Sequence, residues 1–340
     1  MLQLLHTLYI TESDSALHLE GQCLRILHSS GQEDHVPLHL LNSIVTFSHG
    51  TITQNVMAAC AKRGIGLFVL SQNGKFRFQI QGESHGNACL RKRQYMLTEQ
   101  ERLPLASAML RGKIEHQAFL LAKGRRNHPE SGSALLQTAE KMLRDIAQTL
   151  AEKTNSGELR GVEGQASKIY FSAFPNLIRT GEETFYFHGR NRRPPKDKCN
   201  AMLSFAYTML MYECLHALES VGLDPCIGVL HGVRAGRPAL ALDLMEEFRP
   251  VMAERLVLHL INLRMVKPEM FETAEDGGIY FDREGKKIFL REWNRMKQRE
   301  LWVPSLEKNI PIGVLPYLQA LRLSRYLREE ESAFSVIDWR

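Results

Sequence analysis

Residues 65–86 read IGLFVLSQNGKFRFQIQGESHG, and the chain changes its pattern within this stretch. Two apolar runs, 65–70 and 75–80, flank an Asn-Gly pair in the turn at 72–74. Such a pair between two strand-like runs is a strong hairpin signal, because both turn residues tolerate positive φ. The polar residues 82–86 come next. We therefore expect a β-hairpin that closes a first domain, followed at once by a short linker.

The region before this hairpin also consists of short alternating runs separated by turn signals. Leu4 to Ile10 is one such run, and Ala16 to Leu27 is another that is broken at Glu20-Gly21. Thr53 to Arg63 is different, because its apolar residues have helical spacing. The sequence predicts a mainly β domain over residues 1–82, with one short helix in it.

Long segments with a period of 3.6 residues dominate the chain from residue 88 onward. Ala88 to Leu121 predicts two helices divided near Leu103-Pro104, and Ser131 to Lys153 predicts another. Asp197 to Ser220 predicts a helix that begins at a capping residue and stops at Gly222. We predict an α+β protein, in which residues 83–87 link the β-domain to a larger all-α catalytic domain over 88–340.

One exception to the helical pattern is expected near the C-terminus. Residues 274–278 resemble an exposed loop. After it, Tyr280-Phe281 and Ile288-Phe289 flank a turn signal at Glu284-Gly285, which predicts a small hairpin.

The composition indicates an ordinary globular protein with a polyanionic partner. Hydrophobic residues make up 44% of the 340 residues, and charged residues 24%. The formal charge is +5, and the basic residues gather at 90–93, 123–126, 189–193 and 286–299. Each basic run can also be a solvated helix face, and the two interpretations are about equally favoured for any single run.

The six cysteines and the apolar runs indicate the cellular compartment in which the protein is expected. The cysteines form no C-x-x-C pair, which is typical of reduced thiols. No apolar run approaches the roughly 20 residues that span a bilayer, and the N-terminus lacks a signal-peptide pattern. We expect a soluble cytoplasmic protein with no membrane partner.

Four side chains supply the donor atoms that a divalent cation needs: Glu163, His231, Asp243 and Glu246. Carboxylates with one imidazole favour Mg²⁺ or Mn²⁺ over Zn²⁺, because hard cations prefer oxygen and no thiolate joins the set. Each residue has an ordinary alternative. Glu163 can be a helix-start residue, His231 is one of 13 histidines, and Asp243 lies where a helix N-terminus would attract an acid.

The spacing of the acidic residues around Asp243 predicts how their side chains are arranged. Asp243, Glu246 and Glu247 are spaced i, i+3 and i+4, so on a helix they share one face. Pro250 removes a backbone donor next to Arg249 and predicts a kink there. Glu246 lacks the helix-terminus explanation available to Asp243, which makes it the better candidate ligand.

Other catalytic signatures are missing from the sequence. It contains no G-x-x-x-x-G-K-[ST] loop, no G-x-S-x-G elbow, no H-E-x-x-H helix and no G-x-G-x-x-G after a strand. ATPase, serine hydrolase, zinc protease and dinucleotide-binding functions therefore lose support.

Several ordered motifs resemble those of one known family. The stretches 161–164, 192–195 with 200–205, and 222–250 closely resemble the CRISPR adaptation integrase, the universal CRISPR-associated endonuclease that inserts new spacers, as in type I systems. The likeness covers nearly the whole chain. It implies an N-terminal β-domain, a helical domain that holds the metal, and a role in antiviral defence.

The resemblance also implies roles for individual residues. The family's metal ligands fall on Glu163, His231 and Glu246, where some relatives have Asp in place of the last. Asp243 matches a further acid that matters for activity, as a ligand or beside one. The predicted DNA-binding residues are Arg190, Arg192, Arg193, Arg234 and Arg249.

The implied partners are double-stranded DNA, a second copy of the chain and a small second adaptation protein, in a heterohexamer. The implied reaction is a transesterification, in which the 3′-hydroxyl of a captured fragment attacks a phosphodiester of a CRISPR repeat. Two other hypotheses stay open. One is a stand-alone metal-dependent nuclease that repairs branched DNA, and the other is a DNA-binding scaffold without activity.

Overall fold

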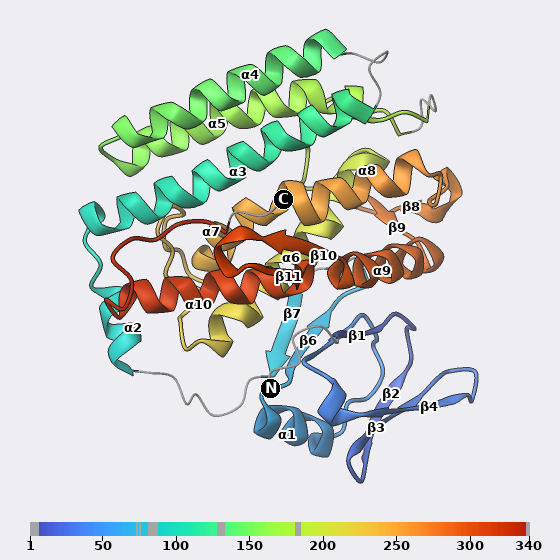
Figure 1. The fold of residues 1–340 in the computed structure, drawn as a ribbon. Helices are drawn as coiled ribbons and strands as arrows, with labels where there is room; N and C mark the ends of the chain where they lie inside the picture. Colours follow the sequence, from blue (N-terminus) through green and yellow to red (C-terminus); the bar gives the residue numbers. More distant parts are fainter. Residues whose placement is uncertain are drawn as a thin grey trace. The chain divides into compact units, whose positions relative to one another are not determined.

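The computed structural model describes residues 7–72, 74, 76–80, 88–127, 133–180 and 185–337 (Figure 1). The chain divides into two compact units. One comprises Met1–His85 with Phe281–Arg299, and the other comprises Gly86–Tyr280 with Glu300–Arg340. The first is rich in strands and the second is mainly helical, so the predicted α+β class is confirmed.

Two sheets build the first unit. The four-stranded sheet has the order β1 (Thr7–Ile10), β5 (Ser43–Thr46), β6 (Gly66–Leu70), β7 (Phe76–Ile80). Its first three strands are parallel, and β7 is antiparallel to β6. The predicted hairpin is therefore confirmed, although Asn73 and the predicted linker at 83–87 lie outside the described residues.

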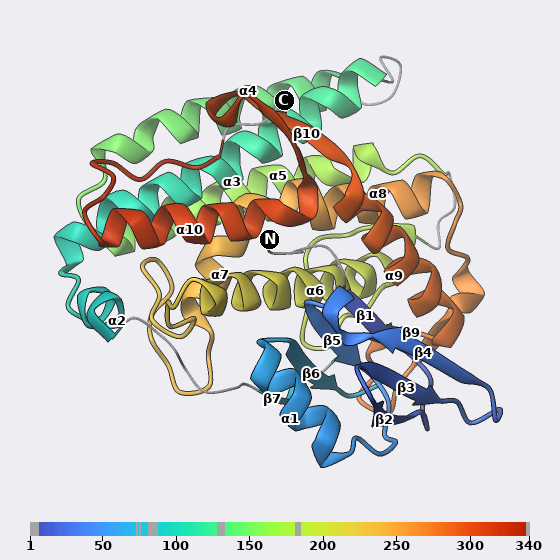
Figure 2. The same ribbon diagram turned by 60° about the horizontal axis from the view of Figure 1, so that its bottom comes forward.

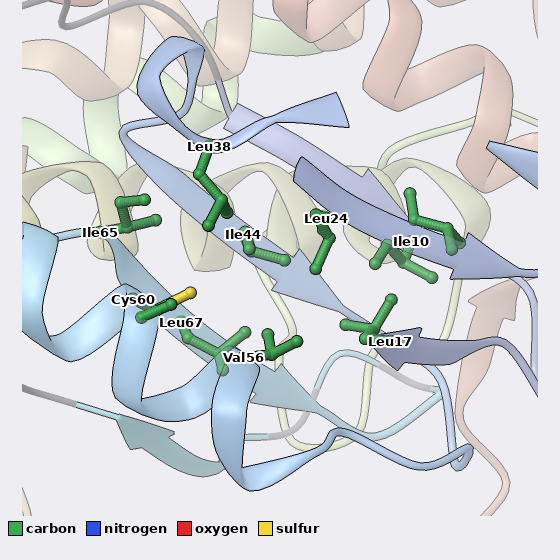
Figure 3. Packing of buried hydrophobic residues seen from close by; sticks show 11 residues of the cluster. Ile10, Leu17, Leu24, Leu38, Ile44, Val56, Cys60, Ile65 and Leu67 are labelled. Carbon is green, nitrogen blue, oxygen red and sulfur yellow. The ribbon is translucent and has the colours of Figure 1, made fainter. Parts of the chain in front are cut away.

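The second sheet is an antiparallel meander of β2 (Ala16–Glu20), β3 (Cys23–Leu27) and β4 (Glu33–Pro37). Helix α1 (Gln54–Arg63) ends at Gly64, whose φ of +67° is the left-handed conformation that glycine adopts without strain. Figure 3 shows how apolar side chains of the strands and of α1, such as Ile44, Val56 and Leu67, point toward one another. This cluster is the core of the first unit.

Helix α9 (Arg283–Gln298) completes the first unit and corrects one prediction. The expected hairpin around Glu284-Gly285 is wrong, because Asp282 caps a helix there by accepting a 2.7 Å hydrogen bond from the Gly285 N–H. The helix then buries Phe289 and Trp293 at helical spacing. The strand pair of this region lies earlier, where β8 (Phe271–Thr273) pairs with β9 (Ile279–Phe281).

The helical unit contains these longer helices: α2 (Ala88–Tyr95), α3 (Glu99–Asn127), α4 (Ser133–Thr149), α5 (Ser156–Ala173), α6 (Lys198–Ser220), α7 (Ala239–Met245), α8 (Arg255–Asn262) and α10 (Leu315–Leu327). Helices α3, α4 and α5 pack against one another as one layer, which both views show (Figure 2). Helix α6 packs against α7 and α10. A hairpin of β10 (Glu300–Val303) and β11 (Lys308–Pro311) precedes α10.

The division between α2 and α3 differs from the predicted one. Pro104 lies inside α3, and the break falls before Glu99. Thr98 and Glu101 form a capping box there: the Glu101 carboxylate accepts from the Thr98 N–H at 2.8 Å, and the Thr98 hydroxyl accepts from the Glu101 N–H at 3.3 Å. This pair of residues was the better boundary signal.

Helix α6 confirms its prediction. Asp197 caps it by accepting a 2.7 Å hydrogen bond from the Asn200 N–H, and Gly222 follows its end with φ of +87°. Within the described residues, no helix combines the length and apolar character that a membrane crossing requires.

Candidate metal centre and DNA interface

Helix α5 places Glu163 near its middle. The helix begins where Asn155 accepts a 3.0 Å hydrogen bond from the Glu158 N–H, so Glu163 is not the helix-start residue of the ordinary alternative. Its side chain is 23% exposed and approaches Lys113 of α3, with 2.8 Å between Oε1 and Nζ. Glu163 therefore faces the α3 helix rather than open solvent.

Asp243 fixes the loop that carries His231. One Asp243 oxygen accepts from the N–H groups of Val229 (2.6 Å) and Leu230 (3.0 Å). The other accepts from the His231 N–H at 2.9 Å and lies 2.5 Å from its Nδ1. Gly228 is needed here, because a Cβ would lie 2.7 Å from an Asp243 oxygen.

These contacts revise the interpretation of Asp243. Helix α7 begins at Ala239, so Asp243 lies within the helix, and the helix-terminus alternative is wrong. With Nδ1 donating to a carboxylate, the His231 ring presents the lone pair of Nε2, which is the tautomer that a metal needs. Asp243 thus positions the imidazole, and both its oxygens are already used.

Glu246 lies at the start of an irregular turn. Residues Glu246–Phe248 form a 3-10 turn and Arg249–Glu254 a π-helical turn before α8, which confirms the kink predicted at Pro250. The Glu246 side chain is 1% exposed. Its Oε2 lies 2.8 Å from Lys113 Nζ, and its Oε1 lies 3.1 Å from Arg249 Nη2.

The Glu246 carboxylate is charged despite its burial. Burial alone would raise its pKa, but the nearby Arg249 and Lys113 cations outweigh this and lower the pKa of Glu246 below its usual value. For Lys113, burial alone would lower the pKa, but the nearby Glu246 and Glu163 carboxylates outweigh burial and raise the pKa. A carboxylate pair therefore surrounds a buried ammonium.

The arrangement can be tested for its fit to a divalent cation. Glu163 Oε1 and Glu246 Oε2 each lie 2.8 Å from Lys113 Nζ. These two carboxylate oxygens are therefore separated by at most twice this distance. Among the described residues, each Glu246 oxygen has one cationic partner and accepts no backbone N–H. Lone pairs are thus left for a cation, and His231 is close enough to contribute to lowering the Glu246 pKa. The donor set fits Mg²⁺ or Mn²⁺.

The acids are nevertheless not spaced for an ion in this conformation. Across the described part of the chain, no three His, Cys, Asp or Glu side chains form a group that could hold one. At this site the Lys113 ammonium lies between Glu163 and Glu246, 2.8 Å from an oxygen of each.

Glu247 does not share the site, contrary to the prediction of one acidic face. Its side chain is buried, one carboxyl oxygen has no hydrogen-bond partner, and its carbonyl accepts a 2.7 Å hydrogen bond from His116 Nδ1. Burial raises the pKa of Glu247 well above its usual value. The three acids do not lie on one regular helix, because the α-helix ends at Met245 and is followed by a 3-10 turn and then a π-helical turn.

Sequence reasoning missed Lys113 and the residues that hold Arg249. Lys113 falls on the apolar stripe of α3, after Met109 and Leu110 at i−4 and i−3, so a charge at a core position was the available signal. Arg249 is held by Tyr207, because its guanidinium lies over the Tyr207 ring at 4.7 Å from the ring centroid. The Tyr207 hydroxyl in turn donates a 2.7 Å hydrogen bond to Glu254.

The five predicted DNA-binding arginines fall into two groups. Arg192, Arg193 and Arg234 are exposed. Arg190 instead donates to Asn200 and Ser204 at 2.6 and 3.1 Å, and Arg249 pairs with Glu246. A DNA contact stays a prediction for all five, and the residues of the second group are only partly exposed.

A cleft of about 260 Å³ opens beside His231. Its lining comes from the starts of α3 and α5 and from the loop after α6: Glu99, Arg102, Leu103, Ala106, Ser156, Leu159, Arg160, Gly228, Val229, Leu230, His231, Gly232 and Val233. Arg102 and Arg160 give it two positive groups close to the imidazole.

Comparison with known proteins places the chain in a family. Residues 8–295 match the family model described as CRISPR associated protein Cas1. The chain belongs to the Cas1 family. It is 38% identical to a CRISPR-associated endonuclease Cas1 of Rhodospirillum rubrum, with 100% of both chains covered. It is 37% identical to another of Chlorobaculum tepidum, with 99% of both chains covered.

Solved structures similar to this Cas1 protein support the fold. A casposase bound to its integration product superposes with a TM-score of 0.85 at 21% identity, covering 97% of this chain and 92% of the other. A Cas1 protein of Thermotoga maritima gives 0.81 at 21% identity, with 98% and 100% covered. A Cas6-RT-Cas1–Cas2 complex gives 0.80 at 21% identity, with 97% of this chain and 36% of that chain covered.

Proposed function

We propose that the chain is a metal-dependent DNA integrase that inserts captured DNA fragments into a CRISPR array. One observation carries the proposal: Glu163 and Glu246 converge on a single cation, beside an imidazole that Asp243 holds in the ligand tautomer. Relatives over 30% identical along the whole chain are named Cas1 endonucleases. The fold is also that of a casposase bound to an integration product.

Glu163, His231 and Glu246 would hold Mg²⁺ or Mn²⁺. When bound, the ion would supply Lewis-acid stabilisation of charge on the phosphate oxygens. The chain's own contribution is orientation, since Asp243 fixes the imidazole and Arg249 stays anchored on Tyr207. The long Glu246 side chain reaches the site from a kinked turn, which places its carboxylate next to that of Glu163.

The proposed reaction exchanges one phosphodiester bond for another. The 3′-oxygen of the fragment bonds to phosphorus at the edge of a repeat and loses its proton. The bond from that phosphorus to the 3′-oxygen of the repeat strand breaks, and that oxygen takes up a proton. No oxidant or energy-rich cofactor is required.

Basic side chains would hold the DNA through its phosphates. Arg192, Arg193 and Arg234 are exposed in the helical unit, and Arg102 and Arg160 line the cleft beside His231. On α9 of the first unit, the exposed cations Arg283, Lys287, Arg291 and Arg295 recur every four residues and so share one face. Phosphate contacts of this kind give weak sequence selectivity and strong salt dependence.

The proposed partners are a second copy of the chain and a small second adaptation protein, together forming a heterohexamer. Strand β7 lies at the edge of its sheet and exposes Phe76 and Phe78, which supports dimerisation through the β-rich unit. A Cas1–Cas2 assembly is present among the solved structures with this fold. Size measurement of the chain alone and with Cas2 checks both associations.

Strand transfer with labelled fragments and a repeat-bearing plasmid tests the proposal. An integrase joins the fragment to the plasmid only with Mg²⁺ or Mn²⁺. Cleavage of branched DNA without joining would indicate the repair nuclease instead, and DNA binding without metal-dependent chemistry would indicate the scaffold.

A further inference from the structure

Lys113 occupies an unusual position for a lysine. Its side chain is 3% exposed, in the middle of a helix whose neighbouring buried residues are mostly apolar. Its ammonium nitrogen is 2.8 Å from a Glu163 oxygen and 2.8 Å from a Glu246 oxygen. The side chain thus links two helical segments through one cation.

The local charges balance only while Lys113 is in place. Glu163 and Glu246 bring two negative charges, which Lys113 and Arg249 offset. Glu246 has almost no contact with water, so without a nearby cation its charge would be costly to bury. Lys113 therefore supplies the counter-charge that keeps the two carboxylates together.

A divalent ion bound by the same carboxylates would compete with the ammonium for this place. An Mg²⁺ or Mn²⁺ ion about 2.1 Å from both oxygens would lie within about 5 Å of the nitrogen. Two cations so close, in a site with little water, repel strongly. Arg249 is fixed by stacking on Tyr207, whereas a lysine ammonium rides on a flexible four-carbon stem.

We propose that the Lys113 ammonium takes the place of the divalent ion in the metal-free protein and leaves it when the ion binds. This inference rests on the proposed metal centre. In this inference Lys113 is a positioning residue. It holds the two carboxylates together before the metal binds, and it lowers the affinity of the DNA-free protein for the divalent ion.

Metal binding by the full chain, without DNA, tests the exchange. Lys113→Met keeps the length and apolar stem but removes the charge. We expect Lys113→Met to bind Mn²⁺ at least about tenfold more tightly than the wild type in calorimetry, because the competing charge is gone. In EDTA the same variant should melt several degrees lower, and saturating Mn²⁺ should restore its stability. Equal or weaker Mn²⁺ binding would overturn the proposal.

Lys113→Arg is the matched control, because it retains the charge. Its Mn²⁺ affinity should stay within about threefold of the wild type, and tightening equal to that of Lys113→Met would show that charge is not the cause. Should Lys113→Met fail to fold, the wild type gives a second measurement. Its Lys113 amine should react faster with an acylating reagent when Mn²⁺ is added, relative to the exposed Lys168. An unchanged or slower rate would contradict the exchange.

Glu163→Gln separates this inference from the proposed function. If Glu163→Gln binds Mn²⁺ like the wild type, the metal centre itself is wrong. If it loses Mn²⁺ binding while Lys113→Met binds no more tightly, the metal centre stands and the exchange alone is refuted.

Discussion

Asp243 and Glu246 lie three residues apart and are both almost fully buried, yet their surroundings are opposite. Asp243 receives three backbone N–H groups and one imidazole nitrogen. Among the described residues, Glu246 is contacted by the two cations Lys113 and Arg249 and accepts no backbone N–H. The first carboxylate is saturated and fixes a loop, whereas the second keeps lone pairs for another cation.

Burial alone therefore does not single out a metal ligand, and the groups that contact the buried carboxylate must be considered as well. Each Glu246 oxygen has one cationic partner, Lys113 or Arg249, and so keeps a lone pair that a second cation can use. In the proposed function this second cation is the divalent ion. The predictions below test whether the two regions behave as differently as their contacts.

Neutralising Glu163 or Glu246 should have the largest effect. Glu163→Gln and Glu246→Gln should each lower strand transfer by about 100-fold to 1000-fold or more, because transition-state charge loses its stabilisation. Rates with Mg²⁺ and Mn²⁺ measure this. Glu247→Gln is the matched control, since Glu247 is the neighbouring buried acid and its raised pKa favours the protonated form that the amide mimics.

Retained activity in either ligand variant would remove that residue from the set. A loss in Glu247→Gln as large as in Glu246→Gln would show that any change in this turn is harmful. The contrast between neighbouring acids would then carry no information about metal.

Asp243→Asn should impair activity less and stability more. An amide cannot accept from all four donors, so at least one buried N–H loses its partner, at a cost of about 1 to 3 kcal/mol. Misorientation of His231 should lower Mn²⁺ affinity or activity by about 10-fold to 100-fold. Melting curves and calorimetry separate the two effects. A variant as stable as the wild type would contradict the saturated-carboxylate account.

Much of the fold could be predicted from local chemistry, because the signals are short-range. The Asn-Gly hairpin and the capped helix after Asp197 are of this kind. The expected hairpin around Glu284-Gly285 failed because the Asp282 cap and the helical spacing of Phe289 and Trp293 outweigh one glycine.

The candidate site was only partly accessible to sequence reasoning. The family pattern pointed to Glu163, His231 and Glu246, and geometry brings the two acids onto one cation. The bonds of Asp243 and the position of Lys113 depend on tertiary packing between segments far apart in the chain. Local spacing contains no information about such contacts, beyond a charge on an apolar stripe.

Replacing exposed arginines should weaken DNA binding and leave the affinity for the divalent ion unchanged. The double variant Arg192→Gln with Arg193→Gln should reduce the slope of log affinity against log salt by about 2, with unchanged Mn²⁺ affinity. Arg144→Gln, an exposed arginine of α4, is the control. An unaltered slope would exclude phosphate contacts at 192 and 193.

Two histidines extend the comparison with the smallest expected effect. His28 has a carboxylate on each ring nitrogen, Glu12 at 2.7 Å and Asp34 at 2.8 Å, whereas among the described residues His231 contacts a carboxylate only through Nδ1. Hydrogen bonds to Asp34 and Glu12 raise the pKa of His28. Because the folded pKa is raised, its stabilisation is fully present below the unfolded value near 6.5 and is lost as pH rises through the folded pKa.

His28→Gln should therefore melt below the wild type at low pH, and the gap should close as pH increases. Thermal unfolding between about pH 5 and pH 9 measures this, with the exposed His35→Gln as control. A gap that widens with pH would reverse the assigned sign.

The central claim is that Glu163, His231 and Glu246 bind one ion at the place that Lys113 now fills. An anomalous-difference map from crystals of the full chain soaked in Mn²⁺ tests it most directly. We expect one peak between the two carboxylates and His231 Nε2, with the Lys113 ammonium displaced. A peak elsewhere, or none while Lys113 keeps both carboxylates, would contradict it.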